Sequence, residues 1–322
     1  MIKRSVSVIL LAVIILGAIP FIGGCSKKDD GRITVICTVF PIYDWVRNIV
    51  GDSDTVEVKL LVSNGADLHS FQPSADDIIA IRDADVIVRV GGQSDAFLND
   101  ILPGCDDITD LSLMSVSGVV VRHSLKESHA HTDGDGHSHA SDEHIWLSVK
   151  NAKASVSAIC GTLCALDGAN AEKYRANTAA YTERLSALDA SFMSAMATAT
   201  KKQVVFADRF PFIYMTEEYG IEHAAAFEGC TTESDASFET VIRLASRLDG
   251  WGLEYIAVTE SSDRELAYAV INATAKKNAR ILVFDSMQSL GEADISAGKS
   301  YIGIMESNLQ TLKVAVGADT GK

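Results

Sequence analysis

The chain is poor in basic residues, with 28 Lys and Arg against 43 Asp and Glu and a formal net charge of −15. Such an acidic surface argues against nucleic acids and anionic lipids as ligands. The chain also lacks a C-x-x-C pair, an H-E-x-x-H motif and a G-x-S-x-G motif. These absences argue against a cysteine metal site, a zinc protease and a serine hydrolase.

Long apolar runs are also scarce, and the clearest one, residues 6–21, lies at the start of the chain behind Lys3 and Arg4. It is shorter than the roughly 20 apolar residues of a membrane-spanning helix. With Gly-Gly before Cys25, it is typical of a secretory signal and resembles a bacterial lipoprotein box. We expect residues 1–24 to be a lipoprotein signal peptide; an ordinary signal peptide and an uncleaved anchor are the alternatives.

Cleavage at that point leaves Cys25 as the lipidated residue of an extracytoplasmic protein anchored to the bacterial cell membrane. Loss of Lys3 and Arg4 moves the net charge from −15 to −17. The other cysteines show no spacing that defines a disulfide framework, and their odd number implies at least one free thiol. They are Cys37, Cys105, Cys160, Cys164 and Cys230.

Short apolar strands alternate with helical patterns in both halves of the chain. The first half has expected strands at 32–38, 56–62 and 84–90, and the second half at 203–207, 223–227, 253–259 and 280–284. Helical patterns lie between these strands and close the chain at 301–316. This alternation predicts parallel sheets covered by helices, with ligands bound beyond the carboxyl ends of the strands.

Residues 170–200 form the longest helical pattern, with apolar side chains three, four or seven positions apart. A helix of that length spans about 45 Å, which is too long for a crossover inside one small domain. We therefore predict an α/β fold of two α/β lobes, each with a mainly parallel sheet, joined by one long rigid α-helix. The expected boundaries are 25–168 for the N-terminal lobe, 169–201 for the linking helix and 202–322 for the C-terminal lobe.

Residues 123–143 interrupt this pattern and consist largely of His, Asp, Ser and Gly, which is typical of a mobile loop. The loop histidines are His123, His129, His131, His137 and His139. Such a tract binds late first-row metals weakly and has little preference for manganese. We expect the loop to concentrate or deliver zinc without forming the tight site, and a solvated loop without a role is the alternative.

Three further motifs place metal-ligating residues where a cleft is expected. His69 follows the second strand in GADLHSFQP, where Asp67 is a candidate for orienting the loop or the ring; His144 lies in DEHIWLS; and Asp285 ends a strand in LVFDSM. Taken singly, each has an ordinary alternative, such as an exposed histidine or a helix N-cap aspartate.

Together, these motifs and the long helix resemble the zinc- and manganese-binding receptors of ATP-driven (ABC) metal importers. The resemblance implies His69 and His144 as ligands from the first lobe and Asp285 as the ligand from the second lobe. It also implies an ABC permease and its ATPase as partners, and we expect a monomer. In this family a His or Glu follows the strand that leaves the long helix, whereas this chain has Ala207 there. Asp208 and Glu260 are equal candidates for the missing ligand, and water is a third.

Two imidazoles with carboxylate oxygens suit Zn²⁺ in tetrahedral geometry and also suit Mn²⁺ or Fe²⁺ in an oxygen-rich shell. The histidine-rich loop favours zinc. The expected function is therefore capture of Zn²⁺ and its delivery to a permease, with no enzymatic activity. The alternatives are the same role for manganese or iron, a zinc hydrolase with Glu260 as its base, and an adhesin-like surface lipoprotein.

Overall fold

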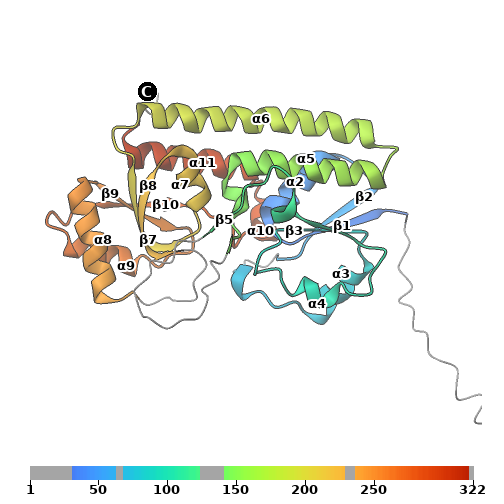
Figure 1. The fold of residues 1–322 in the computed structure, drawn as a ribbon, viewed down its shortest axis with the longest axis horizontal. Helices are drawn as coiled ribbons and strands as arrows, with labels where there is room; N and C mark the ends of the chain where they lie inside the picture. Colours follow the sequence, from blue (N-terminus) through green and yellow to red (C-terminus); the bar gives the residue numbers. More distant parts are fainter. Residues whose placement is uncertain (1–30, 63–67, 124–140, 229–235, 319–322) are drawn as a thin grey trace, which may run out of the picture. The chain divides into compact units, whose positions relative to one another are not determined.

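Figure 1 shows a computed structural model of the chain, which describes residues 31–62, 68–123, 141–228 and 236–318. Arg32–Lys322 form one compact unit, separate from Met1–Gly31. The predictions for Cys25, the signal peptide and Asp67 lie outside the described residues. So do those for all loop histidines except His123, namely His129, His131, His137 and His139. Among the described helices, none is both long and apolar enough to cross a membrane.

The first lobe is built on a parallel sheet with the strand order β2-β1-β3-β4. Its strands are β1 (Ile33–Cys37), β2 (Val56–Leu60), β3 (Val86–Arg89) and β4 (Thr109–Ser112). Its helices are α2 (Phe40–Val50), α3 (Ala75–Asp83), α4 (Leu98–Ile101) and α5 (Val149–Leu166). Alternate residues of β1 enter different apolar cores, because Val35 joins the core with α2 and α5, and Ile36 joins the core with α3 and α4. The sheet therefore has helices on both faces, as predicted.

Short segments of the first lobe lie between these elements. They are the 3₁₀ turns η1 (Leu68–Ser70), η2 (Leu113–Ser115) and η3 (Ile145–Leu147) and the antiparallel pair of β5 (Arg122–His123) with β6 (Ser141–Asp142). The predicted ligand His69 lies in η1, and the predicted ligand His144 directly precedes η3.

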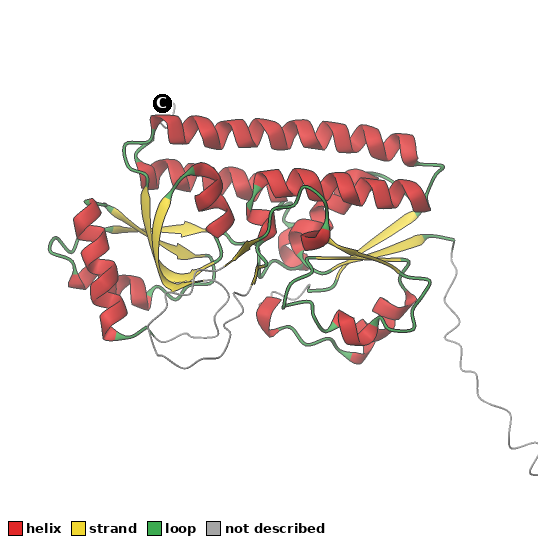
Figure 2. Ribbon diagram, in the orientation of Figure 1, coloured by secondary structure: helices red, strands yellow, loops and turns green. Residues whose placement is uncertain are grey.

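The second lobe repeats the plan, with a parallel sheet of order β10-β9-β7-β8 (Figure 2). Its strands are β7 (Gln203–Phe210), β8 (Glu222–Glu228), β9 (Tyr255–Thr259) and β10 (Arg280–Phe284). Its helices are α7 (Ile213–Tyr219), α8 (Phe238–Trp251), α9 (Glu265–Ala273), α10 (Glu292–Ser296) and α11 (Tyr301–Val316). The strand β7 runs past its predicted end at residue 207, through a register shift between Phe206 and Arg209.

The helix α6 (Ala171–Thr198) has 28 residues and runs alongside both lobes, as Figure 1 shows. It packs against α2 and α5 of the first lobe and against α7 and α11 of the second. In the N-terminal half of α6, Tyr181 donates a hydrogen bond to Asp44 of α2, and in its C-terminal half Asp189 accepts one from Tyr219 of α7. One helix therefore braces both sheets, which confirms the predicted architecture.

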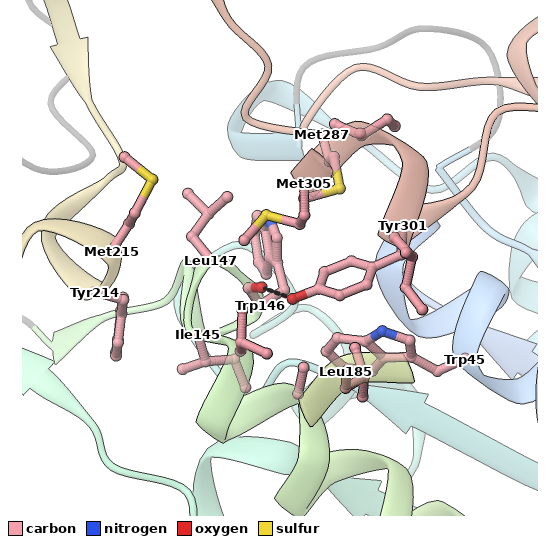
Figure 3. Close-up of a cluster of buried hydrophobic side chains, with 14 of the residues drawn as sticks. Trp45, Ile145, Trp146, Leu147, Leu185, Tyr214, Met215, Met287, Tyr301 and Met305 are labelled. Carbon is pink, nitrogen blue, oxygen red and sulfur yellow. Dashed lines mark hydrogen bonds between the residues drawn. The ribbon is translucent and has the colours of Figure 1, made fainter. Parts of the chain in front are cut away.

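The lobes also meet in an apolar cluster around Trp146 (Figure 3). The hydroxyl of Tyr301 donates to the carbonyl of Trp146 at 2.7 Å, and the indole N–H of Trp146 donates to the carbonyl of Ser286 at 2.9 Å. Met287 is buried in the same cluster. These contacts hold the turn after β10 beside the segment that carries His144.

Candidate metal-binding site

The imidazole of His69 is held from one side by two residues of its own lobe. Its Nδ1 lies 2.7 Å from Ser94 Oγ and 3.1 Å from Glu143 Oε1. The Ser94 backbone N–H and hydroxyl both donate to the Glu143 carboxylate, at 2.9 and 2.5 Å. Because Nδ1 faces this network, Nε2 is the nitrogen that a metal would take. The side chain is 20% exposed, so the ring edge stays accessible.

The imidazole of His144 is oriented in the same manner but is buried more deeply, with 1% of its side chain exposed. The Oδ1 atom of Asp142 lies 2.9 Å from Nδ1 and also accepts the backbone N–H of His144 at 2.9 Å. The Trp146 ring packs edge-on, with its centroid 5.2 Å from that of the imidazole. Nε2 is therefore again the ring atom that a metal would take.

The two imidazoles lie next to each other, with centroids 5.5 Å apart and planes at 73°. Two imidazoles on one tetrahedral zinc ion have centroids about 5 Å apart, because each Zn–N bond is about 2.0–2.1 Å. The spacing fits a shared metal ion. The consecutive residues Asp142 and Glu143 hold one ring each, which makes this part of the site rigid before any metal binds.

The second lobe contributes two carboxylates, which follow neighbouring strands. Asp285 follows β10 and accepts the backbone N–H of Met287 at 2.9 Å. Glu260 follows β9 and accepts the backbone N–H and the hydroxyl of Ser286, at 2.8 and 2.7 Å.

The pKa values of both carboxyls lie above their ordinary range. Burial raises the pKa of Glu260, and the nearby charge of Asp285 raises it further. Burial also raises the pKa of Asp285, against the lowering effects of the Met287 N–H and of Lys299. A bound cation would therefore stabilise the ionised form of this pair.

Asp208, a candidate for the missing ligand, and Ala207, which stands at the family's ligand position, both lie in structural contacts of the second lobe. Asp208 accepts the backbone N–H of Arg209 through Oδ1, and the backbone N–H and hydroxyl of Thr259 through Oδ2, so it ties β7 to β9. Ala207 is buried in the core formed with α8 and α9. In the first lobe, His123 was predicted to begin a mobile loop but lies in β5, paired with Ser141 of β6; it is exposed, with its Nδ1 3.4 Å from Ser141 Oγ.

The lobes touch within the site through Gln288, whose Oε1 lies 2.8 Å from Nε2 of His69. A cavity of about 250 Å³ opens beside this contact, lined in part by His69, Ser94 and Glu143. Within the ranges that the structure describes, no three His, Cys, Asp or Glu side chains gather closely enough to hold a metal ion. The structure brings the two imidazoles together. Coordination of the metal by Asp285 stays a prediction.

The sequence reasoning missed Ser94, Glu143 and Gln288 as site residues. Ser94 lies in the loop beyond β3, and Gln288 lies in the turn beyond β10, so both occupy the carboxyl edge of a sheet where ligands were expected. Glu143 directly precedes His144. The strand-end rule that selected His69 could have pointed to Ser94 and Gln288, and the motif that holds His144 to Glu143, but the contacts themselves depend on the tertiary fold.

Two parallel-sheet lobes joined by a long helix, with an imidazole pair between them, define a two-lobe solute receptor. Residues 35–315 match the family described as zinc-uptake complex component A, periplasmic, and the chain belongs to that family. Membership confirms the predicted family, and the family's description names zinc as its metal and uptake as its setting.

Three similar proteins illustrate the relationship. The zinc-binding lipoprotein AdcA of Streptococcus pneumoniae is 29% identical over 297 residues, which cover 91% of this chain and 58% of AdcA. The chain thus spans little more than half of that relative. The high-affinity zinc uptake system protein ZnuA of Bacillus subtilis is 25% identical over 293 residues, which cover 90% of this chain and 89% of ZnuA. The Zn(II)-bound ZnuA-like domain of pneumococcal AdcA superposes with a TM-score of 0.69 at 26% identity, covering 89% of this chain and 99% of that domain.

Proposed function

We propose that this protein is the extracytoplasmic receptor that captures Zn²⁺ and delivers it to the permease of an ATP-driven importer. The observation that carries the proposal is the imidazole pair of His69 and His144, whose centroids are 5.5 Å apart. The zinc binding named for the pneumococcal relative and the zinc uptake named for the Bacillus relative support the choice of metal.

In this proposal the ion is cargo held between the lobes. His69 and His144 bind it from the first lobe, and Asp285 binds it from the second, so capture ties the lobes together. The helix α6 packs on both lobes and restricts the motion that accompanies capture and release. Because binding needs neutral imidazoles and an ionised carboxylate, affinity falls as the pH drops through the histidine range.

The proposal includes a lipid anchor at Cys25, which the name of the pneumococcal relative supports, and an ATPase that works with the permease. The receptor acts as a monomer. The histidine-rich segment of residues 123–143 raises the local zinc concentration and leaves the tight site to the folded lobes.

Metal titration of the mature protein tests this function. Zn²⁺ and Mn²⁺ are titrated into the wild type, His69→Ala and a variant lacking residues 124–140. We expect one tight zinc site in the wild type and in the deletion variant, weaker manganese binding, and loss of the tight site in His69→Ala. Equal zinc affinity in the wild type and His69→Ala would refute the proposal.

A further inference from the structure

We propose that Gln288 is itself a metal ligand, through its amide oxygen Oε1, and supplies the second-lobe donor that Ala207 does not provide. This inference rests on the proposed function, because it assumes that His69 and His144 bind zinc. In the second lobe, Gln288 Oε1 lies 2.8 Å from the metal-facing nitrogen of His69. Because Nδ1 carries the proton that the ring donates to Ser94 and Glu143, and an amide oxygen only accepts, this contact is a hydrogen bond only when both ring nitrogens are protonated.

The distance between the two donor atoms is the first argument. Gln288 Oε1 and His69 Nε2 are 2.8 Å apart. Two donor atoms on one tetrahedral zinc ion are about 3.4 Å apart, given bonds of about 2.0–2.2 Å. A shift of a few tenths of an ångström therefore turns this contact into a pair of ligands on one ion.

The orientation of the amide is the second argument. The Gln288 side-chain NH₂ donates to the hydroxyl of Ser286 at 3.0 Å, and that hydroxyl donates to Glu260 Oε1 at 2.7 Å. The hydroxyl has a single proton, which it gives to the carboxylate, so it must accept from the amide. This chain of donors points Oε1, with its lone pairs, at His69.

The backbone of the turn is the third argument. Met287 has φ of +62°, in the left-handed region that costs a residue with a side chain roughly 1 kcal/mol or more. Its side chain is buried in the cluster around Trp146, and its N–H is held by Asp285. The packing thus enforces an unfavourable conformation immediately before Gln288, the residue that contacts His69.

Glu260 and Asp208, the carboxylates considered for the ligand that Ala207 does not provide, already accept hydrogen bonds from other residues. Both oxygens of Glu260 accept hydrogen bonds from Ser286, and both oxygens of Asp208 accept hydrogen bonds from Arg209 or Thr259. Glu260 acts on the site through Ser286, by orienting the amide of Gln288. Carbonyl oxygen is a ligand of manganese and calcium sites, and zinc takes oxygen ligands from carboxylates and water, so an oxygen donor at this position fits a divalent cation.

The opposite role for Gln288 is a latch that the metal must displace from His69. The two roles predict opposite effects of removing the amide. Loss of a ligand weakens zinc binding, whereas loss of a latch strengthens it, because the hydrogen bond no longer competes with the ion.

The experiment compares Gln288→Leu, Gln288→Glu and His69→Ala with the wild type, and uses Gln310→Leu on the exposed face of α11 as the matched control. Zinc affinity is measured by competition with a chelator. The visible absorption of bound Co²⁺ reports the coordination shell, and thermal unfolding of the metal-free proteins checks folding.

We expect Gln288→Leu to weaken zinc binding by at least about tenfold and to change the Co²⁺ spectrum. Gln288→Glu, which keeps an oxygen donor, restores the affinity, and Gln310→Leu behaves as the wild type. If His69→Ala loses zinc while Gln288→Leu binds it as tightly as the wild type or more tightly, this inference fails and the proposed function stands. If His69→Ala binds zinc as the wild type does, both fail.

Discussion

Both lobes place buried carboxylates at the site, but the pKa values of these groups are shifted in opposite directions. On the first lobe, burial alone would raise the pKa of Glu143, but hydrogen bonds from His69 and Ser94 lower it from 4.5 to about 2. On the second lobe, burial raises the pKa values of Glu260 and Asp285, and their mutual proximity adds to the shift of Glu260. The first lobe therefore stabilises its carboxylate charge without a metal, and the second lobe does not.

This difference indicates a division of labour. The carboxylates Asp142 and Glu143 position the imidazoles in advance, so the first lobe loses little conformational freedom on binding. The second lobe stabilises the negative charges of Glu260 and Asp285 poorly, and a bound cation would stabilise them. We expect zinc to be recognised by the geometry of one side and attracted by the charge of the other.

The largest expected effect comes from the metal and from a residue that should bind it. Zinc at a thousandfold excess over its dissociation constant should stabilise the wild type by about 4 kcal/mol, because it binds the folded state. Removal of zinc with a chelator should reverse the gain, and His144→Ala should abolish it. Thermal or urea unfolding with and without zinc measures the effect; an undiminished zinc-dependent gain in His144→Ala would contradict the role of the imidazole pair.

The next effect concerns the residues that position the rings. Glu143→Gln should lower zinc affinity by roughly 10- to 100-fold, as is usual when a group that orients a metal ligand is altered. Asp142→Asn should have an effect of the same order, because Asp142 orients His144 as Glu143 orients His69. Chelator competition measures both variants, and a loss confined to one of them would show that the two rings contribute unequally.

The pH dependence of stability should differ in sign between the two sides. The folded-state pKa of Glu143 is depressed, so its contribution is present above about 4.5 and is lost as the pH falls towards 2. The advantage of the wild type over Glu143→Gln should therefore shrink across that range. The folded-state pKa of Glu260 is raised, so the metal-free wild type should gain on Glu260→Gln as the pH falls towards 4.5. Urea unfolding at several pH values tests both trends; parallel trends in the two variants would contradict the contrast.

The smallest expected effect concerns the contact that joins the two sides. Trp146→Phe removes the hydrogen bond to Ser286 O and should cost about 1 kcal/mol of folding stability beyond the loss of ring volume. Trp45→Phe is the matched control, because the indole nitrogen of this equally buried residue has no hydrogen-bond partner among the residues that the structure describes. Equal losses of stability in the two variants, measured by urea unfolding, would argue against a specific tie at Trp146.

The sequence predicted those elements whose apolar pattern is long or strict. The predictions for β10 (Arg280–Phe284) and α11 (Tyr301–Val316) agree with the structure to the residue, and α6 begins and ends within two residues of its predicted limits. The strand β4 (Thr109–Ser112) was missed because TDLS, at the edge of the sheet, carries no apolar run. Local patterns report apolar sequence and burial, and β4 has no fully buried residue to produce one.

The site was only partly predictable for a related reason. His69 and His144 stand in distinctive motifs, and the structure brings their rings together. Gln288 lies 219 residues from His69 in the sequence, and Ser94 lies 49 residues from Glu143. Such contacts are set by how the two lobes pack through Trp146 and α6, which no local pattern encodes.

A crystal structure of the zinc-loaded protein, with anomalous scattering recorded at the zinc absorption edge, tests the account most directly. We predict one strong anomalous peak about 2.0–2.1 Å from Nε2 of both His69 and His144, with an oxygen ligand from the turn of residues 285–288. A peak remote from the imidazole pair, or coordination by first-lobe residues alone, would contradict the claim that zinc is held between the two sides.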